Sequence, residues 1–193
     1  MTGYPAKSRL IEWLHPLWRC QRKGFNMQIE DGVKYFDIRI RFDKNNDVVF
    51  CHGMADVEVP SWMGLCFISD SCLKYNARCR IIIERGKDTG IINRLETNCP
   101  FWRDAVDFIA IKKGWKVLYN ARQPKIIDYS YVPFVSNLSP WDNMCRLLNR
   151  GMITTIKRWA RTHNPRKDYE TLKTDTVIHF MDHYDLNHDN STL

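Results

Sequence analysis

An aspartate, an arginine and a histidine lie close together in two segments rich in β-branched and aromatic residues. Asp37 and Arg39 alternate with the apolar residues of segment 35–42, and His52 follows the apolar run 48–51. A guanidinium offers a planar fork of donors to a phosphate, and a carboxylate can fix the tautomer of an imidazole. An imidazole gives or takes a proton near neutral pH. These three residue types could therefore bind a phosphodiester and protonate its leaving group.

A β-hairpin is predicted to position these side chains. Segment 35–42 alternates strictly between apolar and polar residues, which predicts a half-buried strand, and 43–46 has the composition of a turn. If Phe42 pairs with Asp47 across the turn, Asp37 stands opposite His52, and directly opposed residues share a face. The register therefore predicts that the carboxylate, the guanidinium and the imidazole converge.

Two interpretations of this polar face are open. In the first, Asp37, Arg39 and Arg41 form the solvated face of an edge hairpin, which is the commoner case for an alternating strand. In the second, the face lies inside a barrel, where buried charges must be paired and are usually functional.

The hairpin carries a family resemblance. Segment 28–39 (QIEDGVKYFDIR), followed by His52 and Gly53, resembles the core signature of bacterial-type phosphatidylinositol-specific phospholipase C. It is most similar to short phospholipase C-like phosphodiesterases of bacteria and phages. The similarity extends upstream to 19–21 and, more weakly, to 177–184.

The resemblance implies an α/β fold, a distorted or incomplete TIM-type barrel with its site at the carboxyl ends of the strands. It implies that Arg39 holds the phosphate, where calcium-dependent relatives keep a metal, and that His52 is the general acid. Asp37 matches the acidic residue beside that arginine, and Asp182 matches the aspartate that orients the first catalytic histidine. No cofactor and no metal are implied.

That first histidine has no counterpart in this chain. The family carries it in a segment that would end just where Met1 stands, and His15 matches no histidine of the family. The general base is therefore expected to be absent, and turnover is expected to be weak or lost.

The remaining candidates follow predicted strands. The apolar run 79–84 predicts a buried parallel strand with Glu84 at its exit, where charged residues of a barrel point into the site. Another strand is predicted over 115–119, and Arg122 at its exit resembles a second arginine that contacts phosphate or polyol. The other predicted elements are helices over 26–32, 61–75, 100–113 and from Ser139 onward, and strands over 126–135 and 176–182.

Length and charge bound the class of protein. The 193 residues predict a single domain over 1–193 with a polar tail at about 187–193. The net charge of +7 is spread along the chain. It is interpreted either as a solvated basic surface with no particular partner, which is the commoner case, or as a source of attraction to phosphorylated substrates or to an anionic membrane surface. No nucleic-acid motif is recognised, so no nucleic-acid partner is predicted.

Seven cysteines include no Cys-x-x-Cys pair, so neither a disulfide framework nor a zinc site is predicted. Cys51, Cys66 and Cys145 are interpreted as small buried apolar residues. The histidines and aspartates of 179–189 match no metal-ligand spacing. Segment 1–10 lacks the apolar core of a signal peptide, and no apolar run is long enough to span a membrane. A reduced, cytoplasmic protein is therefore the default expectation, unless an export signal lies upstream.

The leading functional hypothesis is a calcium-independent phosphoric diester hydrolase of the phosphatidylinositol-specific phospholipase C type, acting on a phospholipid or another phosphodiester. The alternative is a non-catalytic binder of anionic lipid head groups or phosphorylated sugars. A metal-dependent glycerophosphodiester phosphodiesterase is disfavoured. Those enzymes place a Glu-x-Asp pair on this strand, and Arg39 cannot be a metal ligand.

Overall fold

The structure is a computed structural model. The residues that it describes are Tyr4, 6–9, Gln21, 23–52, 55–59, 61–85, 90–122, 125–128 and 177–180. The chain divides into two compact units, Met1–His15 with Lys23–Gln123, and Pro16–Arg22 with Pro124–Leu193. The single domain over 1–193 stays a prediction.

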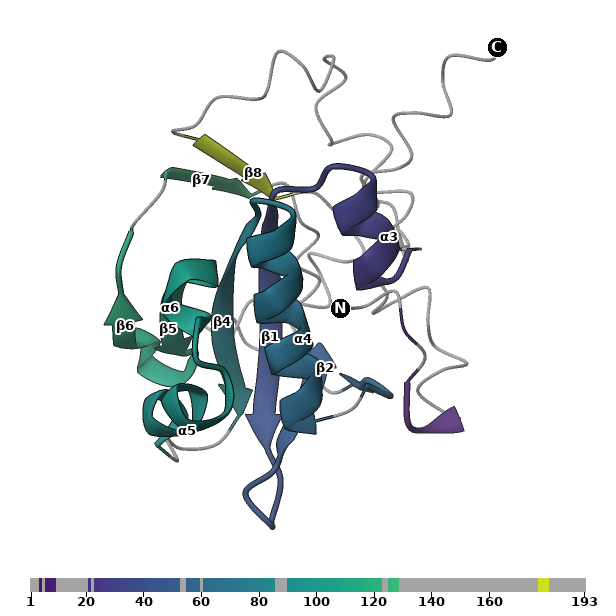
Figure 1. The fold of residues 1–193 in the computed structure, drawn as a ribbon. Coiled ribbons are helices and arrows are strands. Elements are labelled where there is room, and N and C mark those ends of the chain that lie inside the picture. Colours follow the sequence, from purple (N-terminus) through teal and green to yellow (C-terminus); the bar gives the residue numbers. More distant parts are fainter. Residues whose placement is uncertain are drawn as a thin grey trace, which may run out of the picture. The chain divides into compact units, whose positions relative to one another are not determined.

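The first unit contains a mixed six-stranded sheet in the order β3-β2-β1-β4-β5-β6 (Figure 1). The neighbouring strands β1, β4 and β5 are parallel, whereas β2, β3 and β6 each run antiparallel to the strand before them in the chain. The bounds are β1 Tyr35–Phe42, β2 Val48–His52, β3 Ala55–Asp56, β4 Arg78–Arg85, β5 Val106–Ile111 and β6 Lys116–Asn120.

The predicted TIM-type barrel is wrong for the described part of the chain. A barrel needs parallel strands joined by helical crossovers, but β1–β2 and β5–β6 are hairpins that reverse the chain direction. The hairpins leave β3 and β6 as the two ends of the six-stranded sheet, so this sheet is open. The architecture is an open, mixed α/β sheet.

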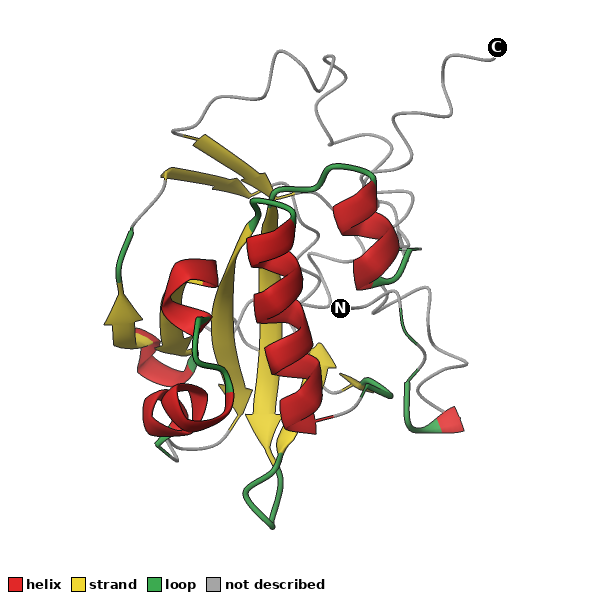
Figure 2. Ribbon diagram, in the orientation of Figure 1, coloured by secondary structure: helices red, strands yellow, loops and turns green. Residues whose placement is uncertain are grey.

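Helices cover one face of this sheet (Figures 1 and 2). Apolar side chains of that face are almost fully buried, among them Ile38, Ile40 and Ile83. At Gly64 the backbone of the longest helix approaches Phe50 so closely that a Cβ would lie 2.8 Å from the ring. The helices among the described residues of this unit are α3 Phe25–Glu30, α4 Ser61–Lys74, α5 Ile91–Asn98 and α6 Trp102–Ala105, with the short 3-10 turn η1 Lys113–Trp115.

The β1–β2 hairpin is confirmed, but its predicted register is wrong. Phe42 pairs with Val48, not with Asp47. The reason is the turn, because the Asp43 carboxylate accepts hydrogen bonds from the backbone N–H groups of Asn45 (2.8 Å) and Asp47 (2.9 Å). Asp47 therefore belongs to the turn. A one-residue slip moves side chains to the other face of the sheet.

The predicted helix over 100–113 is also wrong. Only the short helix α6 forms at its start, and β5 follows directly. Segment 106–111 reads VDFIAI, and most of its side chains are buried. The strand lies between β4 and β6 and pairs with both. Pairing on both edges within the sheet outweighs a helical pattern that depended on few apolar positions.

In the second unit, β7 (Lys125–Asp128) pairs in parallel with β8 (Val177–Phe180). These strands fall within the segments 126–135 and 176–182 that the sequence predicts as strands, apart from Lys125. The helix predicted from Ser139 onward lies outside the described residues.

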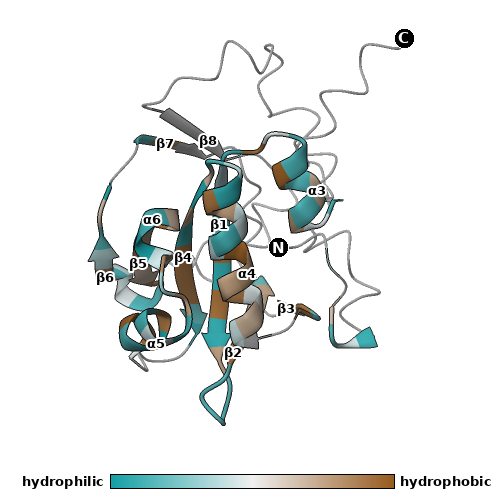
Figure 3. Cartoon of the chain, viewed as in Figure 1, coloured by the Kyte–Doolittle hydropathy of each residue, from teal (hydrophilic) through white to brown (hydrophobic). Residues whose placement is uncertain are grey.

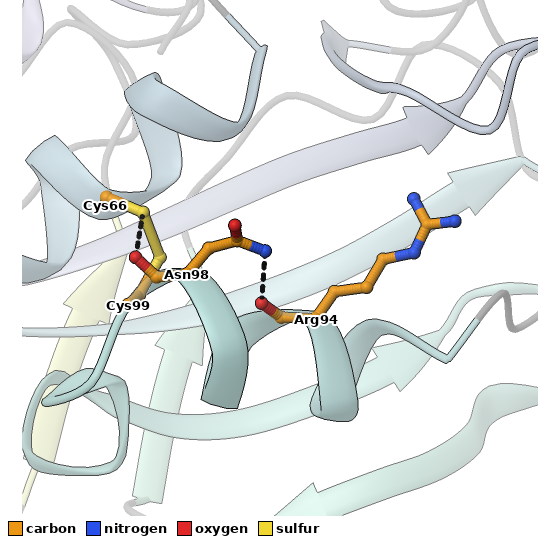
Figure 4. Close-up of a disulfide and its surroundings, with 4 residues drawn as sticks. All are labelled: Cys66, Arg94, Asn98 and Cys99. Atoms are coloured by element: carbon orange, nitrogen blue, oxygen red, sulfur yellow. Dashed lines mark hydrogen bonds between the residues drawn. A yellow bond between two sulfur atoms is a disulfide. The ribbon is translucent and has the colours of Figure 1, made fainter.

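A disulfide joins Cys66 to Cys99, which corrects the expectation that Cys66 is a free buried residue (Figure 4). It ties the middle of α4 to the end of α5, with 5.1 Å between the two Cα atoms. Sequence spacing alone did not predict the pair, because the two cysteines are 33 residues apart on separate helices. Cys51, Cys72 and Cys79 are free and buried.

Candidate functional site

Charged side chains occupy the face of the sheet opposite to Ile38 and Ile40. On β1, Asp37, Arg39 and Arg41 alternate with the apolar residues that pack toward the helices. Charged residues of β3, β4 and the end of β5 join them through ion pairs. We call this set the polar-face cluster; it consists of Asp37, Arg39, Arg41, Asp56, Arg80, Glu84, Arg85 and Lys112.

Arg39 lies between two carboxylates. Its Nε donates to Asp37 Oδ2 at 2.8 Å and its Nη1 donates to Glu84 Oε1 at 2.7 Å. Asp37 also accepts from Arg80 Nε at 2.8 Å, and Glu84 accepts from Lys112 Nζ at 2.9 Å. The resulting chain of ion pairs crosses β1 and β4 and reaches the end of β5.

A second group of ion pairs centres on Asp56 of β3. Arg41 donates to it through Nε, at 2.8 Å, and through Nη2, and Arg85 Nη2 donates to it at 3.0 Å. Two contacts between one guanidinium and one carboxylate fix the orientation of both groups. Asp56 thus holds Arg41 and Arg85 together across β3, β1 and β4.

These pairings keep the carboxylates ionised despite their burial. Burial raises the pKa of Asp37, but the adjacent Arg39 and Arg80 guanidiniums outweigh it and hold the pKa at about 2. For Glu84, Lys112 and Arg39 likewise overcome burial and lower the pKa. The cluster therefore has five cations and three carboxylates at neutral pH, an excess of positive charge.

The most accessible cations lie where parallel strands end. Arg85 ends β4, and Lys112 directly follows β5; their side chains are 46% and 45% exposed. Between them the Glu84 side chain is only 4% exposed. Figure 3 shows the change along β4, brown over its isoleucines and teal at its carboxyl end. This edge therefore offers two accessible cations, Lys112 held by buried Glu84 and Arg85 held by part-exposed Asp56.

Three of the site residues predicted from the sequence come together, namely Asp37, Arg39 and Glu84. His52 does not join them. Because Phe42 pairs with Val48, strand alternation puts His52 on the face of Val48 and Phe50, opposite to Arg39. The convergence predicted from the earlier register is therefore wrong.

Of the other two predicted site residues, the structure describes only Arg122. Arg122 is exposed, and its backbone N–H reaches the Asp107 carbonyl (3.5 Å) near the beginning of β5, the end opposite to Lys112. Asp182 lies outside the described residues. Arg122 does not contribute to the polar-face cluster.

Sequence reasoning missed Arg80, Asp56 and Lys112 as members of the site. Arg80 precedes three isoleucines in a run taken as continuously buried, and Asp56 lies in a two-residue strand. The helix predicted over 100–113 placed Lys112 within a helix and not at the end of a strand. Recognition of β5 as a strand parallel to β4 would have placed Lys112 at a carboxyl end, where ligand contacts are expected.

Nucleophilic and metal chemistry find little support in the described residues. Burial, with the Glu84 carboxylate nearby, raises the pKa of the Cys51 thiol to about 11, so this residue is protonated at neutral pH. No group of three or more His, Cys, Asp or Glu side chains in the described part of the chain is arranged to hold a metal ion. Among the described helices, none has the length and apolar character needed to cross a membrane.

No family model, curated protein or solved structure matches the chain. Membership of the phospholipase C-like family therefore stays a prediction from the hairpin motif.

Proposed function

We propose that the polar-face cluster binds the phosphoryl group of an anionic lipid head group or of a phosphorylated sugar. The observation that carries the proposal is the pair of accessible cations, Arg85 and Lys112, beside buried Glu84 at the ends of adjacent parallel strands. In open α/β sheets, ligands bind outside the carboxyl ends of the strands. Because cations outnumber carboxylates in the cluster, a phosphoryl group supplies compensating negative charge.

Binding is better supported than cleavage. The predicted cleavage mechanism requires Arg39 and His52 to act on one substrate, yet these residues belong to opposite faces of the sheet. Hydrolysis of a phosphodiester therefore rests on the family resemblance alone.

Titration with inositol 1-phosphate, followed by calorimetry, tests the proposal. We expect Lys112→Met to weaken binding about tenfold, since a hydrogen bond to a charged group contributes roughly 1.5–3 kcal/mol. The matched control is Lys113→Met, which removes the same charge from the adjacent position. Lys113 has no ion pair with a described residue, and its variant should change the affinity less than about twofold.

Flotation with vesicles of phosphatidylserine and phosphatidylcholine separates the two sources of the phosphoryl group. Flotation without measurable binding of the free sugar phosphate indicates a lipid head group, and the reverse indicates a soluble ligand. His52→Ala should leave either affinity unchanged. Equal weakening by the two lysine variants, or no binding of either probe, would contradict the proposal. Consumption of a phosphodiester that stops in His52→Ala would support cleavage instead.

A further inference from the structure

The outer edge of β6 is unpaired in the described part of the chain. This strand ends the six-stranded sheet and pairs only with β5. The backbone hydrogen bonds of the neighbouring loops involve Trp115 and Ala121, on either side of β6, but no residue within it. An edge with free N–H and C=O groups is a template for one more strand.

Positive charge is concentrated around this edge. From Phe108 to Arg122 the sequence contains four lysines and arginines and not one aspartate or glutamate. Lys112 is paired with Glu84, but Lys113 and Lys116 form no ion pair with any described residue. The edge of β6 therefore carries uncompensated cations, and the complementary partner is acidic.

The turn before β6 exposes an aromatic side chain at the cost of backbone strain. Gly114 (φ 73°) and Trp115 (φ 48°) are consecutive residues in the left-handed region, which is unfavourable for tryptophan. Trp115 is 60% exposed, and Val117 on β6 is 50% exposed. A strained, exposed tryptophan beside an open strand edge provides an apolar anchor for a ligand.

We propose that the edge of β6 binds an extended acidic peptide segment of another protein as an additional strand. Main-chain hydrogen bonds to β6 supply affinity, and Lys113 and Lys116 pair with acidic side chains of the segment. Trp115 and Val117 contact its apolar side chains. A nucleic acid would match the charge but has no peptide backbone to pair with the edge. This site is separate from the polar-face cluster and does not depend on its function.

The probe is a capped ten-residue peptide that alternates glutamate with valine, with its lysine–valine counterpart as the first control. Amide hydrogen exchange on the whole chain should show at least tenfold protection of β6 by the acidic peptide. At the opposite end of the same sheet, the exchange of β3, whose Asp56 carbonyl accepts from the Lys7 N–H, should not change. The lysine peptide should protect neither edge.

Charge-reversal variants locate the contact. Lys113→Glu combined with Lys116→Glu should weaken peptide binding at least tenfold, and Trp115→Ala about fivefold. The matched control is Lys44→Glu in the β1–β2 turn, which should change the affinity less than twofold. Circular dichroism and retained binding of inositol 1-phosphate or anionic vesicles, whichever the wild-type chain binds, show that a variant is folded.

Four outcomes would overturn the inference. The first is that the acidic peptide fails to bind, and the second is that it binds without protecting β6. The third is that single-stranded DNA of equal charge competes with the peptide and protects β6 equally, which would indicate a general polyanion surface. The fourth is that sedimentation shows a dimer and that β6 is already protected in the absence of peptide, which would indicate that a second copy of this chain occupies the edge.

Discussion

The two faces of the six-stranded sheet come from the same strands but have opposite chemistry. On β1, Ile38 and Ile40 are completely buried beneath helices, whereas Asp37 and Arg39 on the other side are joined in ion pairs. Burial of apolar area stabilises the first face by roughly 25 cal/mol per Å². On the second, ion pairing offsets the cost of removing charges from water and adds little net stability. The helix-covered face therefore maintains the fold, whereas the polar face is the one for which we propose a role in recognition.

The largest expected effect is on the helix-covered face. Ile38→Ala should lower the free energy of unfolding by about 4 kcal/mol, because it leaves a cavity in a fully buried site. Urea unfolding measures the loss. The matched change on the other face is the double variant Arg41→Met with Asp56→Asn, which removes both partners of an ion pair. It should change stability by less than about 1 kcal/mol. Equal losses on the two faces would remove the distinction between them.

The disulfide should contribute the next largest effect. Cys66–Cys99 closes a loop of 33 residues between two helices, and loss of such a crosslink costs about 3 kcal/mol. Urea unfolding with and without dithiothreitol measures this contribution. In the variant with Cys66→Ala and Cys99→Ala, the reductant should have no effect. Wild-type stability that is insensitive to the reductant would mean that the crosslink does not hold the helix layer.

The smallest effect is expected on the polar face, and it depends on pH. The pKa of Asp37 is about 2 in the folded chain and near 4 in an unfolded one. A carboxyl whose pKa is lowered by folding contributes stability above its unfolded pKa, and this is lost as the pH falls through the folded value. The contribution of Asp37, about 2 kcal/mol, should therefore disappear progressively from about pH 4 to below pH 2. Glu84 and Asp56, whose pKa values are also lowered, should add to the loss in this range.

Urea unfolding at pH 7, 4 and 2 in the wild-type chain and in Asp37→Asn measures this contribution. The variant should be less stable at pH 7, and the difference should shrink toward pH 2. An unchanged difference at all three values would show that the Asp37 ion pairs are not linked to folding.

Patterns within one element were enough to predict much of the sheet and of α4. Strict alternation in 35–42 predicted β1, with Asp37 and Arg39 on one face, because side chains of a strand point to opposite faces in turn. The apolar run 79–84 predicted the buried parallel strand β4 and Glu84 at its exit. The composition of 61–75 predicted the helix that covers the sheet.

Contacts outside the single strand or helix decided the rest. The Asp43 carboxylate, by capturing the N–H of Asp47, set the hairpin register and thereby put His52 on the face opposite to Arg39. Pairing with β4 made a strand of 106–111, which brought Lys112 to Glu84. The sequence by itself determined which side chains share a strand face, since that follows from local geometry. Which strands are neighbours, and in which register, depends on the free energy of pairing across the whole sheet, so only the tertiary structure could assemble the site.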